Sequence, residues 1–495
     1  MVNNGRIKEV TEDMGMLKSI SLENYKCFKN SGEIEIAPLT VLCGVNSSGK
    51  SSILKSLLML KQSYENGLDI NSLSLNGIYT NNGRFSAVVH GRNQNKFSID
   101  TNFEFRKSNY ISAQEKQALN ELEKIFCVKY SNISNIKYAT INIHYDIKNQ
   151  NRKNLSYGDN VINNITISIQ INKMITTSLC FDFAGDQNYN ITLINFPSDD
   201  NLQKKIELPS VYCYFDNFKI INMHYTEVIP SQNVDKVVSN IYSIFRIVSL
   251  QFKDIRYISP LRDTPRRRYV IEKDVNTVGI YGENTIQIVE KMQEKKGRIN
   301  SLPSETGFKK GYMPINQKIS DAINIWLDYI GIDRYSSVPY DDLIKLSIGK
   351  DNILDVGFGI SQLFPILVNN ITSPYKTTTL LEQPEVHLHP KMQMNVADML
   401  IATSKAHKNV IVETHSDHII NRIVKRIMQD ETGDLRDNVK IYFFSKEGEE
   451  TKWEEIKVNM VTGIEHAPKG FFEQFGNETM EIVDIGLQNL EKGIQ

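Results

Sequence analysis

The stretch Leu39–Ser52 reads LTVLCGVNSSGKSS, and within it Gly44–Ser51 fits the pattern GxxxxGK[ST]. An apolar run comes before the first glycine, and apolar residues at helical spacing follow the lysine. A strand that enters such a loop and leaves it as a helix directs backbone N–H groups and the positive end of the helix toward one point, where phosphate oxygens bind. Lys50 would neutralise the charge of the β- and γ-phosphates, and the Ser51 hydroxyl would complete a Mg²⁺ shell. The stretch therefore predicts a strand, a phosphate-binding loop and a helix.

The loop and the first turn of the helix supply the predicted nucleotide contacts. These residues are Gly44, Asn46, Ser47, Ser48, Gly49, Lys50, Ser51 and Ser52. The alternative interpretation is a chance match, which is expected in roughly a few per cent of chains of this length. The strand before the motif and the helix after it are the context that phosphate binding requires, so they favour the functional interpretation.

The N-terminal end of the chain is typical of an α/β protein, and the middle is typical of a β-rich insertion. Strands are predicted at Leu17–Leu22 and Ile34–Cys43, followed by a helix at Ser51–Tyr64. Between residues 65 and 250 polar and apolar residues alternate as in a half-buried strand, with one short helical interruption. The clearest alternating runs are Ile141–Ile147 and Ile165–Ile171, and the helix is Ala113–Phe126.

Strands and helices alternate again toward the C-terminal end, after an amphipathic helix at Ile319–Ile330. The predicted elements are strand Thr377–Leu381, helix Lys391–Ala406, strand Asn409–Glu413, helix Ser416–Met428 and strand Val439–Phe444. Such repetition predicts an α/β fold with a mostly parallel sheet and right-handed crossovers, interrupted by a large β-rich insertion. The expected division is an extension at 1–15, an N-terminal lobe at 16–110, the insertion at 111–250, a C-terminal lobe at 251–460 and a tail at 461–495.

Composition excludes several classes of protein. The chain has 495 residues, of which 40% are hydrophobic and 23% charged, so it can bury a sizeable core. Its 57 basic and 58 acidic residues leave a net charge of −1, so no overall field attracts nucleic acid or an anionic membrane. The five cysteines form no CxxC pair and predict neither a disulfide framework nor a zinc site. Without a long apolar run or a signal-peptide pattern, the chain is predicted to be cytoplasmic.

Two predicted strand ends supply the second half of a nucleotide site. Glu382 ends one strand and is the candidate carboxylate for Mg²⁺, because such an acid is needed at the end of a neighbouring strand. The next strand ends in Glu413-Thr414-His415, which brings His415 to the same edge of the sheet. The alternatives are a surface acid for Glu382 and a structural histidine for His415. A zinc site at His387 and His389 is a weak interpretation, because a two-residue spacing on a loop is not specific.

The order of these elements resembles the ABC/SMC class of ATPases. Gly44–Ser51 is similar to the Walker A loop, Gly357–Gln362 to the signature loop, Glu382 to the Walker B acid and His415 to the switch histidine. The resemblance implies an ABC/SMC-type ATPase head with ATP and Mg²⁺ as cofactors and with contacts from Gly359 and Ser361. In that class the signature loop of one subunit closes over the nucleotide of another, so the resemblance also implies a homodimer or higher oligomer.

The whole chain also resembles a bacterial family of OLD-like predicted ATPases, which includes the ATPase subunit of Septu antiphage defence systems. The stretches that carry this resemblance are ENYKCF, LCGVNSSGKSS, FSAVVHG, YISPLRDTPRRRY, DVGFGISQLFPIL, LLEQPEVHLHP, VIVETHSDHIINRI and PKGFF. The resemblance implies a separate nuclease partner, of the HNH type in Septu. Because 80 residues follow His415 and some of them complete the core, the chain is not expected to contain a nuclease domain of its own.

Two positions depart from the pattern of the ABC class. Gln383 stands where the catalytic glutamate is usual, and Gly357 stands where the signature loop usually has serine. The amide of Gln383 can orient a water molecule but cannot accept its proton. Glu385 is the alternative residue for that role. Losing a general base typically lowers a rate by about 10²–10⁴. The sequence therefore predicts slow hydrolysis, with Glu382, Gln383, Glu385 and His415 as the candidate catalytic residues.

The densest basic cluster comprises Arg262, Arg266, Arg267 and Arg268. It can bind nucleic-acid phosphates, a partner chain or the nucleotide, and the sequence leaves these alternatives open. A second cluster, Arg422, Lys425 and Arg426, is better explained by solvent exposure or by ion pairs within the chain. The favoured hypothesis is a nucleotide-gated assembly module that controls a nuclease partner. The alternative is an actively hydrolysing ATPase in DNA sensing, repair or remodelling.

Overall fold

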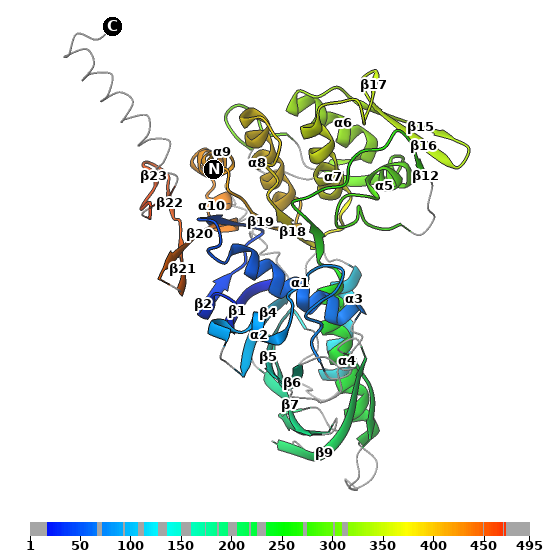
Figure 1. Cartoon of the computed structure of the whole chain (residues 1–495). Helices are drawn as coiled ribbons and strands as arrows, with labels where there is room; N and C mark the ends of the chain where they lie inside the picture. Colours follow the sequence, from blue (N-terminus) through cyan, green and yellow to red (C-terminus); the bar gives the residue numbers. More distant parts are fainter. Residues whose placement is uncertain are drawn as a thin grey trace, which may run out of the picture.

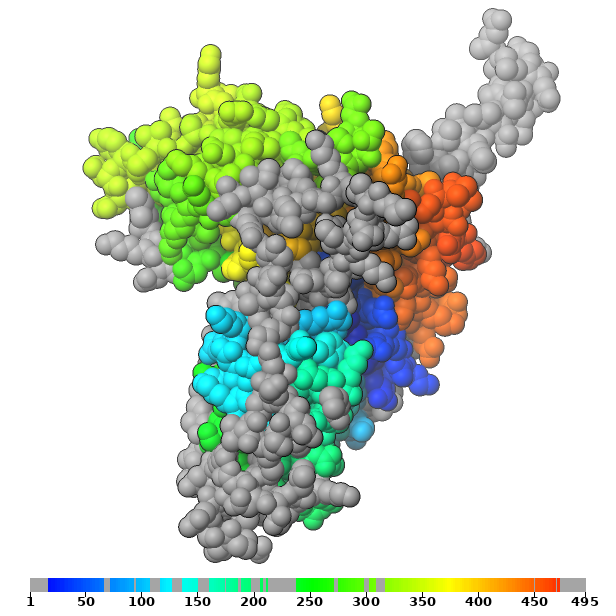
Figure 2. Space-filling model, turned by 180° about the vertical axis from the view of Figure 1, so that it is seen from behind, coloured from blue at the N-terminus to red at the C-terminus, as the bar shows by residue number. Residues whose placement is uncertain are grey.

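A computed structural model describes residues 17–66, 72–92, 95–106, 113–126, 136–149, 160–173, 175–185, 188–196, 205–216, 219–224, 234–270, 275–299, 302–308, 315–448, 450–468 and 470–471. The proposed extension at 1–15 and most of the proposed tail lie outside the described residues. An α/β part with a mostly parallel sheet adjoins a long antiparallel sheet (Figure 1). Seen from behind, the C-terminal half forms the broad end of the molecule and the insertion forms the narrower end (Figure 2).

The parallel sheet has six strands in the order β11-β18-β19-β3-β20-β21. Their bounds are β11 Arg256–Ile258, β18 Thr378–Glu382, β19 Asn409–Glu413, β3 Leu39–Gly44, β20 Val439–Glu447 and β21 Glu450–Glu455. Only the last pair, β20 with β21, is antiparallel. Every residue of β18 and β19 is buried, as expected for parallel strands that are covered on both faces.

Helices cover both faces of this sheet, and alternate residues of β3 belong to different cores. Leu42 packs in the core that contains α1 (Lys50–Asn66), whereas Val41 and Cys43 pack in the other core. That second core contains α7 (Phe358–Thr372), α8 (Pro390–Lys405) and α9 (Asp417–Met428). The central strand is therefore fixed from both sides at the point where it enters the loop.

The antiparallel sheet has nine strands in the order β10-β9-β8-β7-β6-β5-β4-β1-β2. Their bounds are β1 Leu17–Tyr25, β2 Phe28–Glu35, β4 Lys96–Arg106, β5 Tyr138–Asn149, β6 Asn160–Ile171, β7 Ile175–Gly185, β8 Asn188–Ile194, β9 Lys205–Asp216 and β10 Lys219–His224. The alternation predicted around Ile141–Ile147 and Ile165–Ile171 is confirmed in β5 and β6. The strands of the insertion thus extend a sheet that β1, β2 and β4 begin.

The remaining elements surround these two sheets. Helices α3 (Ala113–Phe126) and α4 (Val234–Lys253) pack on each other, and a small sheet of β12, β15, β16 and β17 packs with α5 and α6. Their bounds are α5 Thr285–Met292, α6 Ile319–Ile330, β12 Tyr269–Val270, β15 Tyr335–Tyr340, β16 Leu343–Ile348 and β17 Asp351–Asn352. The short elements are α2 Phe85–Val88, η1 His90–Arg92, α10 Asp434–Asn438, β13 Lys296–Ile299, β14 Ile315–Lys318, β22 Val458–Asn459 and β23 Gly463–Ile464.

The predicted fold class is confirmed: a mixed α/β fold with a mostly parallel sheet and a large antiparallel β insertion. One predicted strand, Ile34–Cys43, is wrong, because β2 ends at Glu35 and β3 begins at Leu39. Pro38 lies between them and has no N–H to donate to a sheet. The prediction also missed α4, a 20-residue helix in the region expected to be β-rich. Within the described part of the chain, no helix is long and apolar enough to cross a membrane.

Candidate nucleotide-binding site

The loop at residues 45–49 connects β3 to α1, and two glycines give it its shape. Gly44 has φ +125°, and a Cβ built there would lie 2.1 Å from the Phe444 carbonyl oxygen on the neighbouring strand. Gly49 has φ +100°, and a Cβ built there would lie 2.5 Å from Cys27 Sγ. Both positions combine a left-handed backbone with a close neighbour, so each requires glycine. The glycines of the motif are therefore explained by this fold.

The loop lines a cavity of about 340 Å³, which is large enough for part of a nucleotide. The residues that line it are Cys27, Asn46, Ser47, Ser48, Gly49, Lys50, Ser51, Ser52, Gln383, Glu413 and His415. They come from β1–β2, the loop, and the ends of β18 and β19. The structure thus brings most of the predicted nucleotide residues together with Gln383 and His415, which are more than 330 residues away in the chain.

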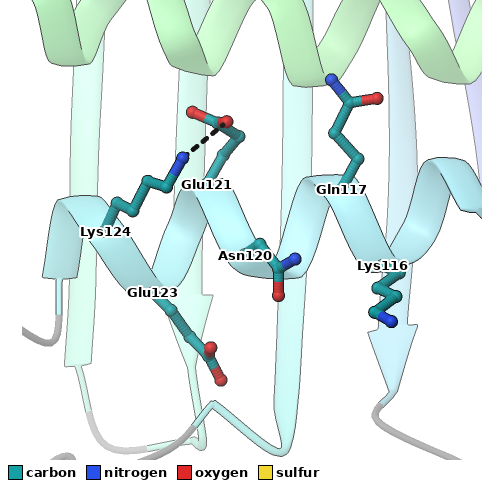
Figure 3. Close-up of a pocket in the computed structure, with 6 residues that line it drawn as sticks. All are labelled: Lys116, Gln117, Asn120, Glu121, Glu123 and Lys124. Carbon is teal, nitrogen blue, oxygen red and sulfur yellow. Dashed lines mark hydrogen bonds and ion pairs between the residues drawn. The ribbon is translucent and has the colours of Figure 1, made fainter.

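A second hollow, of about 640 Å³, has a different character. Figure 3 shows the six side chains around it, all from α3: Lys116, Gln117, Asn120, Glu121, Glu123 and Lys124. Glu121 forms ion pairs with Lys124 and Arg246. Because this hollow gathers residues of one helix, and because Glu121 is paired and Glu123 accepts from the Ile136 N–H, it is a weaker candidate than the loop cavity.

Lys50 is held by the loop itself. Its Nζ donates to the carbonyl oxygens of Gly44 at 3.0 Å and Val45 at 2.7 Å. The side chain is buried, and this burial lowers the pKa of Lys50, an effect that the nearby Glu413 opposes. An ammonium group in the cavity wall, away from bulk water, attracts phosphate oxygens more strongly than an exposed one does.

Two buried carboxylates lie side by side at the edge of the parallel sheet. Glu382 and Glu413 are partners in the register of β18 and β19. Glu413 Oε1 accepts a hydrogen bond from Ser51 Oγ at 2.9 Å, and Glu382 Oε1 accepts one from the Tyr257 hydroxyl at 2.9 Å. Burial, and then the charge of Glu382, raises the pKa of Glu413 to about 7, and burial also raises the pKa of Glu382. Bringing a cation here would relieve this unfavourable pairing of like charges.

These groups fit a hard cation such as Mg²⁺, which binds oxygen ligands and usually keeps waters and phosphate oxygens in its shell. The available oxygens are the Ser51 hydroxyl and the carboxylates of Glu413 and Glu382. Glu413 Oε2 is buried and has no hydrogen-bond partner among the described residues. Over the same part of the chain, no group of three or more His, Cys, Asp or Glu side chains could hold a metal alone. The donor set therefore suits a Mg²⁺ that arrives with a nucleotide.

Glu385 supports the loop that carries His415. Its Oε2 accepts from Thr414 Oγ1 at 2.9 Å, and its Oε1 accepts from the His415 backbone N–H at 2.7 Å. Burial raises the pKa of Glu385, and these hydrogen bonds oppose the shift. Burial and the positive charge of Lys50 lower the pKa of His415, so its imidazole is neutral at pH 7. Both oxygens of Glu385 are thus engaged with the backbone and side chain of the next strand end.

Arg262 fixes the backbone around Gln383. Its Nη2 donates to the carbonyl oxygens of Glu382 at 3.0 Å and Gln383 at 3.2 Å. Gln383 has φ +45°, and its N–H donates to the Glu413 carbonyl oxygen at 2.8 Å. Burial lowers the pKa of Arg262 to about 10, and the group remains charged at pH 7. Hydrogen bonds on both sides of the peptide therefore hold an unusual backbone conformation that presents Gln383 to the cavity.

The basic clusters separate into different environments. Arg262 is buried at the site, whereas Arg266, Arg267 and Arg268 are exposed. Arg267 forms two hydrogen bonds with Asp355, at 3.0 and 2.9 Å, and Arg266 pairs with Asp263 at 3.3 Å.

The second cluster behaves as the sequence suggested. Arg422 and Arg426 both pair with the buried Asp398 at 2.7 Å. The interpretation as ion pairs within the chain is confirmed for these two arginines.

The signature-like loop lies at the start of α7, and Gly359 and Ser361 are not among the described residues that line the cavity. A Cβ at Gly359 would lie 2.5 Å from the His387 carbonyl oxygen, and Ser361 Oγ donates to the Phe358 carbonyl oxygen at 2.7 Å. Phe358 is 47% exposed and packs edge-on against the His387 ring.

His389 caps α8 by accepting from the Lys391 N–H at 3.3 Å.

Sequence reasoning did not single out three residues at the site: Glu413, Tyr257 and Cys27. Glu413 had a usable signal, because it ends a predicted strand parallel to the one that carries Glu382. Tyr257 ends up opposite Leu380 in the pairing of β11 with β18, which the sequence does not reveal. Cys27 sits between β1 and β2 and reaches the loop only through the packing of the two sheets.

Comparison with known proteins places the chain among ATPases. The family model described as an AAA ATPase domain matches residues 16–420. No curated protein matched the sequence.

Three of the matching solved structures are heads of SMC proteins, at 11 to 13% identity. An SMC head bound to the C-terminal winged-helix domain of ScpA has a TM-score of 0.41, with 90% of this chain and 98% of that chain covered. The SMC head domain from Thermotoga maritima has a TM-score of 0.35, with coverage of 90% and 100%. The head from Pyrococcus furiosus, bound to the C-terminal domain of ScpA, has a TM-score of 0.40, with coverage of 89% and 96%. Because the family model covers most of the chain, the protein belongs to the AAA ATPase domain family, which generally uses ATP and Mg²⁺.

Proposed function

We propose that this chain binds ATP with Mg²⁺ at the loop cavity and that nucleotide occupancy, with slow hydrolysis, gates its assembly with a separate nuclease. The observation that carries the proposal is the cavity itself, where the phosphate-binding loop meets Gln383, Glu413 and His415. Lys50 and the N-terminus of α1 bind phosphate charge, and Ser51 with Glu382 would hold the cation. Mg²⁺ bound there would shield the charge of the phosphates from the attacking water.

Slow hydrolysis follows from the groups that face the cavity. Gln383 can orient a water molecule through its amide but cannot accept a proton. Glu385 has both oxygens engaged by Thr414 and His415. His415 is the remaining candidate base, and its lowered pKa keeps it neutral but makes it a weak proton acceptor. The site thus suits prolonged binding of ATP better than rapid turnover.

A homodimer would complete the site. Gly359 and Ser361 lie outside the cavity of their own chain, and the loop residue Val45 and the α7 residue Phe358 are 55% and 47% exposed. Exposed apolar side chains beside polar site residues are typical of a surface that another subunit covers. A second copy can therefore bring its signature-like loop over the nucleotide bound by the first.

The cellular role in this proposal comes from the sequence resemblance to OLD-like ATPases of antiphage systems such as Septu. There the ATPase subunit acts with an HNH-type nuclease. The second candidate is an actively hydrolysing ATPase in DNA sensing, repair or remodelling. The exposure of Arg266, Arg267 and Arg268 favours it, because exposed arginines can bind phosphates of nucleic acid.

Steady-state phosphate release with Mg²⁺ and ATP distinguishes the two functions, with Lys50→Ala as the blank. Release between the level of the blank and about one per minute, while wild-type protein still binds ATP, supports a nucleotide-gated module. Turnover above about one per minute would contradict slow hydrolysis and support the second candidate.

A further inference from the structure

We propose that Glu413 is a second acidic residue of the cation site: it orients the Ser51 hydroxyl and takes part in holding the Mg²⁺ that accompanies ATP. The inference rests on the proposed nucleotide binding and adds a residue that the Walker motifs do not include. Its basis is the position of Glu413 in the sheet, its contact with Ser51 and its second carboxylate oxygen, which has no hydrogen-bond partner among the described residues.

The order of the strands puts Glu413 nearer to the loop than Glu382. Strand β19 lies between β18 and β3, and Glu413 is the register partner of Leu42, two residues before Gly44. Glu413 lines the cavity, whereas Glu382 is not among the described residues that line it. Glu382 accepts a hydrogen bond from Tyr257, on the side away from β19. The acid of the Walker B position is therefore one strand farther from the phosphate-binding loop than Glu413 is.

The contact with Ser51 has the direction that a cation site needs. Ser51 Oγ donates its hydrogen to Glu413 Oε1 at 2.9 Å, which leaves the lone pairs of the hydroxyl oxygen available for a cation. The second oxygen, Oε2, is buried without a hydrogen-bond partner among the described residues. A buried acceptor without a partner is unfavourable, and a cation or its bound water would satisfy it. One carboxylate can thus fix the hydroxyl and face the cation with its other oxygen.

A purely structural Glu413 would behave differently. If its only task were the hydrogen bond to Ser51, glutamine would replace it well, because the amide oxygen can accept the same bond. If Glu413 contributes charge to the cation site, glutamine keeps the fold but weakens Mg²⁺ binding. Removing one of two adjacent buried carboxylates should also make the protein without ligand at least as stable as the wild type.

The test uses the full chain, a fluorescent ATP analogue and a Mg²⁺ titration that starts in EDTA. For Glu413→Gln we expect affinity in EDTA within about twofold of wild type and a Mg²⁺ half-saturation raised at least tenfold. Binding of Mn²⁺ in the presence of ATP, measured by electron paramagnetic resonance, should weaken in parallel. Glu431→Gln, at an exposed position, is the matched control and should leave both measurements unchanged.

Three outcomes decide the matter. A Mg²⁺ half-saturation of Glu413→Gln equal to that of wild type would overturn the proposal. Thermal unfolding supports the proposal without depending on activity if Glu413→Gln gains less stability than the wild type when Mg²⁺ and ATP are added. Its stability in EDTA should then equal or exceed that of the wild type. If the wild type binds no nucleotide in either condition, the proposed function fails first, and Mn²⁺ binding without nucleotide then decides whether Glu413 holds a cation.

Discussion

The replacement Glu385→Gln separates two roles for Glu385, the acid two residues after Gln383. The carboxylate accepts hydrogen bonds from Thr414 Oγ1 at 2.9 Å and from the His415 N–H at 2.7 Å. Glutamine keeps one acceptor oxygen for the His415 N–H, but its NH₂ only donates, so the Thr414 hydroxyl, which already accepts from the Ser416 N–H, would have to rotate and accept a second hydrogen bond from a neutral group. Since a hydrogen bond to a charged group contributes about 1.5–3 kcal/mol, the free energy of unfolding should fall by about that amount.

The assay combines denaturant unfolding with single-turnover hydrolysis at several pH values. We expect Glu385→Gln to unfold at lower denaturant concentration and to keep the pH profile of the wild type, because Glu385 is engaged by Thr414 and His415 and does not accept the proton of the attacking water. The converse variant, Gln383→Glu, places a carboxylate in the cavity and should raise turnover by about 10²–10⁴ if an absent base limits the rate. Glu431→Gln is the control for loss of a carboxylate at an exposed position.

The reasoning would be refuted if Glu385→Gln kept wild-type stability while its turnover fell by two or more orders of magnitude. That result would make Glu385 the general base, and the hydrogen bonds seen here would then have to rearrange when nucleotide binds.

Two further predictions concern the scaffold. Gly44→Ala places a Cβ 2.1 Å from the Phe444 carbonyl oxygen and should lower the free energy of unfolding by about 1–3 kcal/mol, measured by denaturant unfolding. Gly185→Ala is the control, because Gly185 also has a left-handed backbone, at φ +107°, but no described atom lies within 4 Å of its built Cβ. It carries backbone strain without the contact and should lower stability less. Burial lowers the pKa of Lys408 to about 7, so between pH 7 and about 10.4 unfolding takes up a proton and stability rises with pH by up to about 1.4 kcal/mol per unit. Lys408→Met should remove this contribution to the slope of unfolding free energy against pH. The control Lys350→Met, at an exposed position, should keep it. Equal slopes in the two variants would contradict the assignment of this pH dependence to Lys408.

The parallel sheet could be predicted because its strands are short apolar runs with motifs at their carboxyl ends. β18, β19 and α8 lie within about two residues of their expected bounds, and α6 has the bounds expected. The error at Ile34–Cys43 arose because apolar residues continue across Pro38, so hydrophobicity alone did not mark the break. Helix α4 was missed because it follows a long alternating region, although Ile241, Ile244, Phe245 and Val248 are buried at helical spacing.

The candidate site was harder to predict than the fold. Sequence motifs identify side chains at strand ends, but strand order decides which of them meet. Glu382 and Glu413 both end strands, yet β19 is the one beside β3, and so Glu413 contacts Ser51. Arg262 was grouped with three exposed arginines by sequence, but it is buried and donates to the carbonyl oxygens of Glu382 and Gln383, which are about 120 residues away in the chain. Such contacts depend on tertiary packing, which periodicity does not encode.

The central claim is that the loop cavity binds ATP through Lys50, and the most direct test is isothermal titration calorimetry of ATP with Mg²⁺. The wild type is predicted to bind ATP, and Lys50→Ala is predicted to show no detectable binding while it unfolds at the same temperature as the wild type without ligand. Wild-type affinity in Lys50→Ala, or no binding by the wild type, would contradict the account.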